Sequence, residues 1–106
     1  MSLDGFDVEK AKNVIFNQIR PEIRKMAMLQ EQKFRLYDEE RGNPFLCTDQ
    51  NFLRIRVNEE TREMKKAMDD KKTPITIWKE AADRCNFILM QAVAYEYEWK
   101  TEHKNK

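Results

Sequence analysis

The sequence predicts an all-α domain of four helices, and two features of its composition carry that prediction. Helix-breaking residues are few, with two glycines and three prolines in 106 residues. Helix-forming residues such as Glu, Lys, Arg, Met and Ala are abundant, and runs of β-branched residues are rare. A chain of this length corresponds to one domain, which we expect to span residues 1–106 with flexible ends at residues 1–6 and 101–106.

Proline and glycine mark the boundaries of the first two helices. We expect helices over residues 8–20 and 21–37, because proline is tolerated in the first turn of a helix. One long helix kinked at Pro21 is the alternative. The run Arg-Gly-Asn-Pro at residues 41–44 predicts a loop within residues 38–48.

The second half of the chain predicts two longer helices joined by a short turn. The third helix should begin at Asp49, a favourable N-cap, and end in the charged stretch 69–72. Thr73 precedes a proline, which disfavours the α conformation at that residue. The fourth helix should therefore follow and run over residues 75–99.

The overall charge and the cysteine content exclude several kinds of partner and site. The formal net charge is +1, so there is no electrostatic case for a nucleic-acid or membrane partner. Cys47 and Cys85 match neither a disulfide framework nor a zinc pattern. We therefore expect a cytoplasmic protein.

One acidic residue interrupts the apolar stripe of the third helix. At about 100° per residue, Leu53, Val57, Met64 and Met68 share one narrow face, and Glu60 lies among them. An acidic side chain in such a stripe is costly unless its charge is compensated. Glu60 is thus predicted to be buried for a functional reason.

The fourth helix is apolar on two sides. The first face contains Trp78, Ala82, Cys85, Leu89 and Ala92, and the second contains Phe87, Met90 and Ala94. Two apolar faces need packing partners on both sides, and a four-helix chain supplies only one layer. We expect a homo-oligomer, at least a dimer, that completes the bundle.

Both of these helices carry closely spaced carboxylates. Glu59 or Glu60 lies within one turn of Glu63, and Glu80 within one turn of Asp83. If the two helices are antiparallel neighbours, the pairs meet and repel one another unless a cation intervenes. Mg²⁺ suits an all-oxygen site, with Mn²⁺ as a substitute, whereas zinc would require a Cys/His cluster.

At this point the chain resembles a known family. Residues 59–63 have the form EExxE and residues 80–83 the form ExxD, with residues 64–79 between them. This arrangement is similar to the signature of the MazG-like all-α nucleoside triphosphate pyrophosphohydrolases, and the run from Glu80 to Phe87 resembles their EAADVANF segment. Lys33 resembles a lysine that precedes the first acidic motif of the family. The resemblance covers about residues 28–94.

The resemblance implies an enzyme that hydrolyses a nucleoside triphosphate to the monophosphate and pyrophosphate. Glu60, Glu63, Glu80 and Asp83 would hold Mg²⁺, and Glu59, together with Glu60, would have a catalytic role. The family further implies that Asn86 and Lys33 bind substrate, Asn86 at the sugar or a water and Lys33 at the phosphates. A role in nucleotide-pool housekeeping is expected on the same grounds, and the two-faced fourth helix predicts a dimer or tetramer.

Some positions depart from the family pattern, and two other functions remain open. Arg84 and Cys85 replace a small apolar pair, and Val93 and Ala94 replace a polar segment, which puts base specificity in doubt more than metal binding. The alternatives are a non-enzymatic helical oligomerisation module and a metal-dependent nucleotide sensor with vestigial activity.

Overall fold

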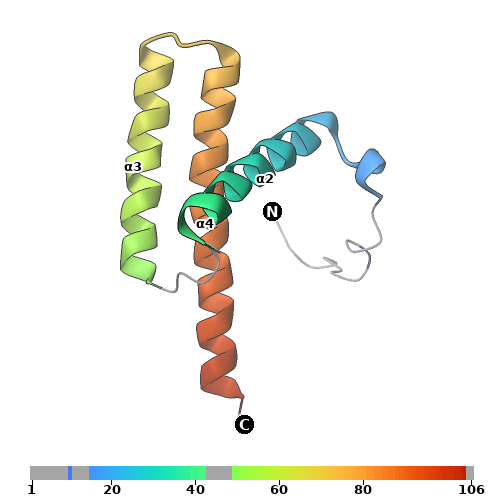
Figure 1. The fold of residues 1–106 in the computed structure, drawn as a ribbon, viewed down its shortest axis with the longest axis vertical. Coiled ribbons are helices and arrows are strands. Elements are labelled where there is room, and N and C mark those ends of the chain that lie inside the picture. The colour runs from blue at the N-terminus through green and yellow to red at the C-terminus, as the bar shows by residue number, and fades with distance from the viewer. Residues whose placement is uncertain (1–9, 11–14, 43–48, 105–106) are drawn as a thin grey trace, which may run out of the picture.

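The computed structural model describes residues 10, 15–42 and 49–104, and this part of the chain is helical (Figure 1). It contains a short 3₁₀ turn, η1 (Phe16–Gln18), and the three α-helices α2 (Pro21–Arg41), α3 (Gln50–Asp69) and α4 (Pro74–His103). The all-α prediction is confirmed. Within the described residues three α-helices are present rather than four.

The predicted first helix is wrong over its C-terminal part, while residues 8, 9 and 11–14 lie outside the described part of the chain. Phe16–Gln18 form a single 3₁₀ turn, and Ile19 and Arg20 have extended backbone. Two causes explain this. Arg20 precedes a proline, which disfavours the α conformation, and Ile15 and Phe16 are 62% and 48% exposed, so little burial supports a helix there.

Helix α2 begins at Pro21, as predicted, and continues four residues beyond the predicted end at Tyr37. It ends at Gly42, whose N–H donates to the carbonyl oxygen of Asp38 and whose φ of 81° lies in the left-handed region. Glycine adopts that region without steric cost, so this residue stops the helix.

Helices α3 and α4 form an antiparallel hairpin, with α2 crossing it at an angle (Figure 1). Asp49 is the N-cap of α3, as predicted: its Oδ1 accepts a hydrogen bond from the Phe52 N–H at 3.1 Å. The turn after α3 closes with two hydrogen bonds, from the Lys71 N–H to the Met68 carbonyl and from the Lys72 N–H to the Ala67 carbonyl. This is a Schellman arrangement, and it reverses the chain before α4.

Helix α4 has 30 residues and extends well beyond the N-terminal end of α3 (Figure 1). It includes residues 100–103, past its predicted end at Trp99 and inside the predicted flexible tail. The His103 ring stacks on the Trp99 ring with 4.1 Å between centroids, and Lys100 pairs with Glu96 at 2.6 Å. These one-turn contacts extend the helix.

The core lies where the three helices meet. It consists of Phe34 from α2, Leu53 from α3, and Phe87, Met90 and Ala94 from α4, with Val57 packed against them. The second predicted apolar face of α4 is therefore buried inside the chain. The first face is buried at Ala82, which is 0% exposed, whereas Leu89 and the flanking Ile88 are 41% and 43% exposed. None of the helices in the described residues combines the length and apolar character that a membrane span requires.

Candidate metal centre

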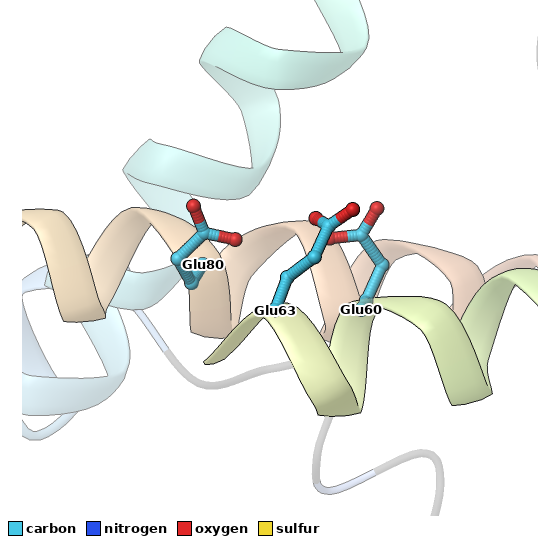
Figure 2. A group of neighbouring side chains, drawn as sticks. All are labelled: Glu60, Glu63 and Glu80. Carbon is cyan, nitrogen blue, oxygen red and sulfur yellow. The ribbon is translucent and has the colours of Figure 1, made fainter. Parts of the chain in front are cut away.

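The α3–α4 hairpin brings three of the predicted acidic residues together. Glu60 and Glu63 lie one turn apart on α3, and Glu80 lies opposite them in the first half of α4. One carboxylate oxygen from each residue lies within 4.8 Å of the other two. Figure 2 shows their carboxyl groups on the same side of the hairpin. The prediction that the acidic pairs of the two helices meet is confirmed for these three residues.

Glu60 is buried, as its place in the apolar stripe predicts, with only 3% of its surface exposed. Its Oε1 accepts from Arg56 Nη2 at 3.0 Å, whereas its Oε2 is buried without a hydrogen-bond donor. Two ionised carboxylates cannot donate to each other, so Oε2 needs either a proton shared with Glu63 or a cation. Orphaned buried oxygens of this kind are rare in native structures, and a bound cation would satisfy this one.

The electrostatics of Glu60 agree with this geometry. Burial raises the pKa of its carboxyl group to about 7, with further contributions from a hydrogen bond to Glu63 and from the charges of Glu63 and Asp83. Arg56 opposes the rise. Without a cation, the site therefore favours the protonated acid, and a divalent cation would favour the ionised carboxylate.

Glu80 and Asp83 occupy the α4 side of the site. Glu80 also has a buried Oε2 without a hydrogen-bond donor. Burial is the main cause of its raised pKa, and repulsion from Asp83 and Glu63 adds to the rise. Burial likewise raises the pKa of Asp83, and nearby Lys33 opposes that shift. Asp83 lies outside the group of three carboxylates, and its role as a metal ligand stays a prediction.

Glu59 lies at the edge of the site, paired with the Arg56 guanidinium. Its side chain is 37% exposed, so solvent can reach its carboxylate. Its predicted catalytic role is compatible with that access. Like Asp83, it does not belong to the group of three carboxylates found among the described residues.

The two predicted substrate-binding residues occupy different environments. Lys33, on α2, is 31% exposed and its Nζ lies 3.4 Å from Asp83 Oδ2. Asn86 is 1% exposed, and its Nδ2 donates to the backbone carbonyl of Gln30 at 3.2 Å, which ties α4 to α2. Its Oδ1 is buried without a donor. In this arrangement Asn86 supports helix packing, and its role toward a sugar stays a prediction.

Two further residues of the site were not predicted. Arg56 bonds both Glu59 and Glu60, and the i,i+3 and i,i+4 spacing of these three residues is the signal that reveals it. Tyr37 of α2 lies close enough to Asp83 and Glu60 for their charges to raise its phenol pKa, after the larger effect of burial. No sequence motif marks this tyrosine, because its place depends on how α2 crosses the hairpin.

The donor set fits a hard divalent cation. All three clustered donors are carboxylates, two of them contribute a buried oxygen without a donor, and no His or Cys joins the cluster in the described residues. Mg²⁺ prefers such oxygen ligands and normally keeps part of its coordination sphere for water and phosphate. The exposed side chain of Glu63 leaves one side of the cluster open.

Comparison with known proteins adds no relative to this description. No protein-family model, no curated protein and no solved structure matches the chain.

Proposed function

We propose that the protein is a Mg²⁺-dependent nucleoside triphosphate pyrophosphohydrolase that acts in the cytoplasm as a homo-oligomer and helps to maintain the nucleotide pool. The observation that carries the proposal is the buried, unsatisfied Glu60 carboxylate beside Glu63 and Glu80 in a three-carboxylate cluster. The EExxE and ExxD motifs that supply these residues resemble those of the MazG-like enzymes. That resemblance supports the choice of a triphosphate as substrate.

In this proposal Glu60, Glu63 and Glu80 hold Mg²⁺, and Asp83 is a further ligand or orients the other three. Bound Mg²⁺ would neutralise phosphate charge and organise the triphosphate for attack by water. Lys33 would turn its ammonium group from Asp83 toward the phosphates, which its position at the accessible edge of the site allows. A lysine binds phosphate as a point charge and needs no fixed orientation to do so.

Glu59 is the residue best suited to accept a proton from the attacking water. Its carboxylate is partly exposed and lies beside the cluster rather than within it. Its carboxylate pairs with the Arg56 guanidinium, which holds it at the edge of the cluster. Glu60 is less suited to that role, because its burial favours its protonated form until a cation is bound.

The test is hydrolysis by the purified protein. A panel of canonical and modified nucleoside triphosphates is incubated with Mg²⁺, and release of pyrophosphate and of the monophosphate is measured. Glu60→Gln should abolish release by removing a ligand charge, whereas Asp69→Asn should not, because Asp69 is 63% exposed and lies in an ion pair with Lys65. Absence of pyrophosphate release for every nucleotide would refute the enzymatic proposal.

One observation favours a second candidate, a non-enzymatic oligomerisation module. The first apolar face of α4 leaves Ile88 and Leu89 exposed, and Tyr95, Tyr97 and Trp99 are each at least half exposed further along the helix. Exposed apolar surface of this extent is typical of an interface. Oligomerisation is common to both candidates, so only the metal and nucleotide experiments separate them.

A further inference from the structure

Arg56 is held in place by three contacts from two helices. Its Nη2 lies 3.0 Å from Glu60 Oε1, and its Nη1 bonds Glu59 Oε2. Its guanidinium carbon lies 4.9 Å from the centre of the Phe87 ring on α4. The side chain is 28% exposed, and Phe87 is 6% exposed and part of the core. The guanidinium is therefore fixed between α3 and α4, one turn before the carboxylate cluster.

The guanidinium engages only one of the two oxygens of Glu60. Oε1 accepts the Arg56 hydrogen bond, and Oε2 remains buried and without a donor next to Glu63 and Glu80. A carboxylate fixed through one oxygen cannot rotate freely, so its second oxygen keeps a constant position. The contact therefore does not block the site but determines which oxygen is left for a ligand.

From these contacts we infer that Arg56 is a positioning residue for the divalent cation site: it holds Glu60 Oε1 so that Oε2 is presented to the metal. The inference rests on the proposed metal-dependent function, because it assumes that the cluster binds a cation. Partners that orient metal ligands in this way commonly alter metal affinity 10- to 100-fold when they are changed.

A simpler role for Arg56 would be charge compensation alone. Lysine would serve that role equally well, because it carries the same charge. It cannot replace the planar fork that bonds Glu59 and Glu60 at once, nor the flat face that stacks on Phe87. Arg56→Lys therefore separates positioning from charge, and simple electrostatics predicts no loss of metal affinity for this variant.

The experiment measures the affinity of the full-length protein for Mn²⁺ without nucleotide, by electron paramagnetic resonance of the free ion. Arg56→Lys should weaken Mn²⁺ binding about 10-fold or more while the helical circular dichroism is retained. Arg54→Lys is the matched control, because Arg54 lies on the same helix, is exposed and donates to Asn51. It should bind Mn²⁺ as the wild type does.

A second variant guards against a folding defect. Phe87→Leu keeps an apolar core residue and removes the ring beneath the guanidinium, so it should weaken Mn²⁺ binding in the same direction by a smaller factor. Wild-type or tighter affinity in Arg56→Lys would overturn the inference. If Arg56→Lys does not fold, the Mn²⁺ affinity of Phe87→Leu decides: affinity at or above that of the wild type would overturn the inference. If neither variant folds, the inference is also overturned, because Arg56 would then support the folding of the hairpin.

Failure of the positioning role can be distinguished from failure of the proposed enzymatic function. If the wild type binds Mn²⁺ and Arg56→Lys binds it weakly, the inference stands even when no nucleotide is hydrolysed. If the wild type binds no Mn²⁺, the metal site and the role of Arg56 both fall. Hydrolysis by the wild type together with unchanged affinity in Arg56→Lys would refute the positioning role alone.

Discussion

Lys33 Nζ on α2 lies 3.4 Å from Asp83 Oδ2 on α4, so an ion pair joins the crossing helix to the edge of the carboxylate cluster. The pair is partly accessible, with the two side chains 31% and 16% exposed. Lys33 therefore adds a positive charge beside residues that are expected to bind a cation, and the same charge is available to an anionic substrate.

Replacement of Lys33 by methionine should move metal and substrate binding in opposite directions. Removal of a positive charge beside the cluster should tighten Mn²⁺ binding by about threefold, a small effect because the pair is partly solvated. Loss of a phosphate-binding charge should raise the KM for a nucleoside triphosphate about 10-fold. Steady-state kinetics and Mn²⁺ titration test this, with the exposed Lys79→Met as the control; an unchanged KM would contradict the phosphate role.

The stability of the metal-free protein should fall as the pH rises. The pKa of Glu60 is about 7 in the folded protein, above its ordinary value of 4.5, so its contribution to stability is complete below pH 4.5 and is lost as the pH rises through 7. The pKa values of Glu80 and Asp83 are raised as well and act in the same direction. Urea unfolding in the presence of a chelator should give a free energy of unfolding roughly 1–3 kcal/mol lower at pH 8 than at pH 5.

Two comparisons isolate the cause of this pH dependence. Glu60→Gln cannot ionise, so its stability should change less between the two pH values. Excess Mg²⁺ should restore the stability of the wild type at pH 8, because a cation favours the ionised carboxylates. Equal stability of the metal-free wild type at both pH values would contradict the raised pKa.

Lys71 provides a stability prediction independent of the site. Its φ of 55° is left-handed, a conformation that costs a residue with a side chain about 1 kcal/mol or more. It occupies the C′ position of the Schellman turn after α3, where glycine is preferred. Lys71→Gly should raise the free energy of unfolding by about 0.5–1 kcal/mol, as measured by urea unfolding. Lys72→Gly, one residue later and without a left-handed φ, should give no gain; equal effects of the two variants would contradict this account.

The exposed part of the first face of α4, at Leu89 and Ala92, predicts association between copies of the chain. Light scattering coupled to size exclusion should give a mass of at least twice that of one chain. Leu89→Lys places a charge on this face and should reduce the mass, whereas Glu102→Lys, at an exposed position in the last turn of α4, should not. A monomeric wild type would mean that the first face of α4 needs no partner.

Local sequence signals predicted most of the fold and the centre of the site. Three helix starts were predicted from local signals, namely Pro21, Asp49 and the Thr73-Pro74 step. These signals are reliable because capping and proline geometry act over one or two residues. The burial of Glu60 followed from helical periodicity, and its meeting with Glu80 from the short turn between the two helices. Each of these inferences required only local geometry.

The remaining features depend on tertiary packing, which the pattern does not contain. The α-helix predicted up to Arg20 was wrong because Ile15 and Phe16 stay largely exposed there. The hydrogen bond from the Asn86 amide to the Gln30 carbonyl was not predicted, because it depends on how α2 crosses α4. The angle at which α2 crosses the hairpin decides both the partner of Asn86 and the placing of Tyr37.

The central claim is that Glu60, Glu63 and Glu80 form a divalent cation site, and a calorimetric titration of the protein with Mn²⁺ tests it most directly. The wild type should show saturable binding, and Glu60→Gln should weaken it by at least 10-fold while retaining its helical circular dichroism. The Asp69→Asn variant, with an exposed acid neutralised on the same helix, should bind as the wild type does. No saturable binding by the wild type, or equal affinity in Glu60→Gln, would contradict the account.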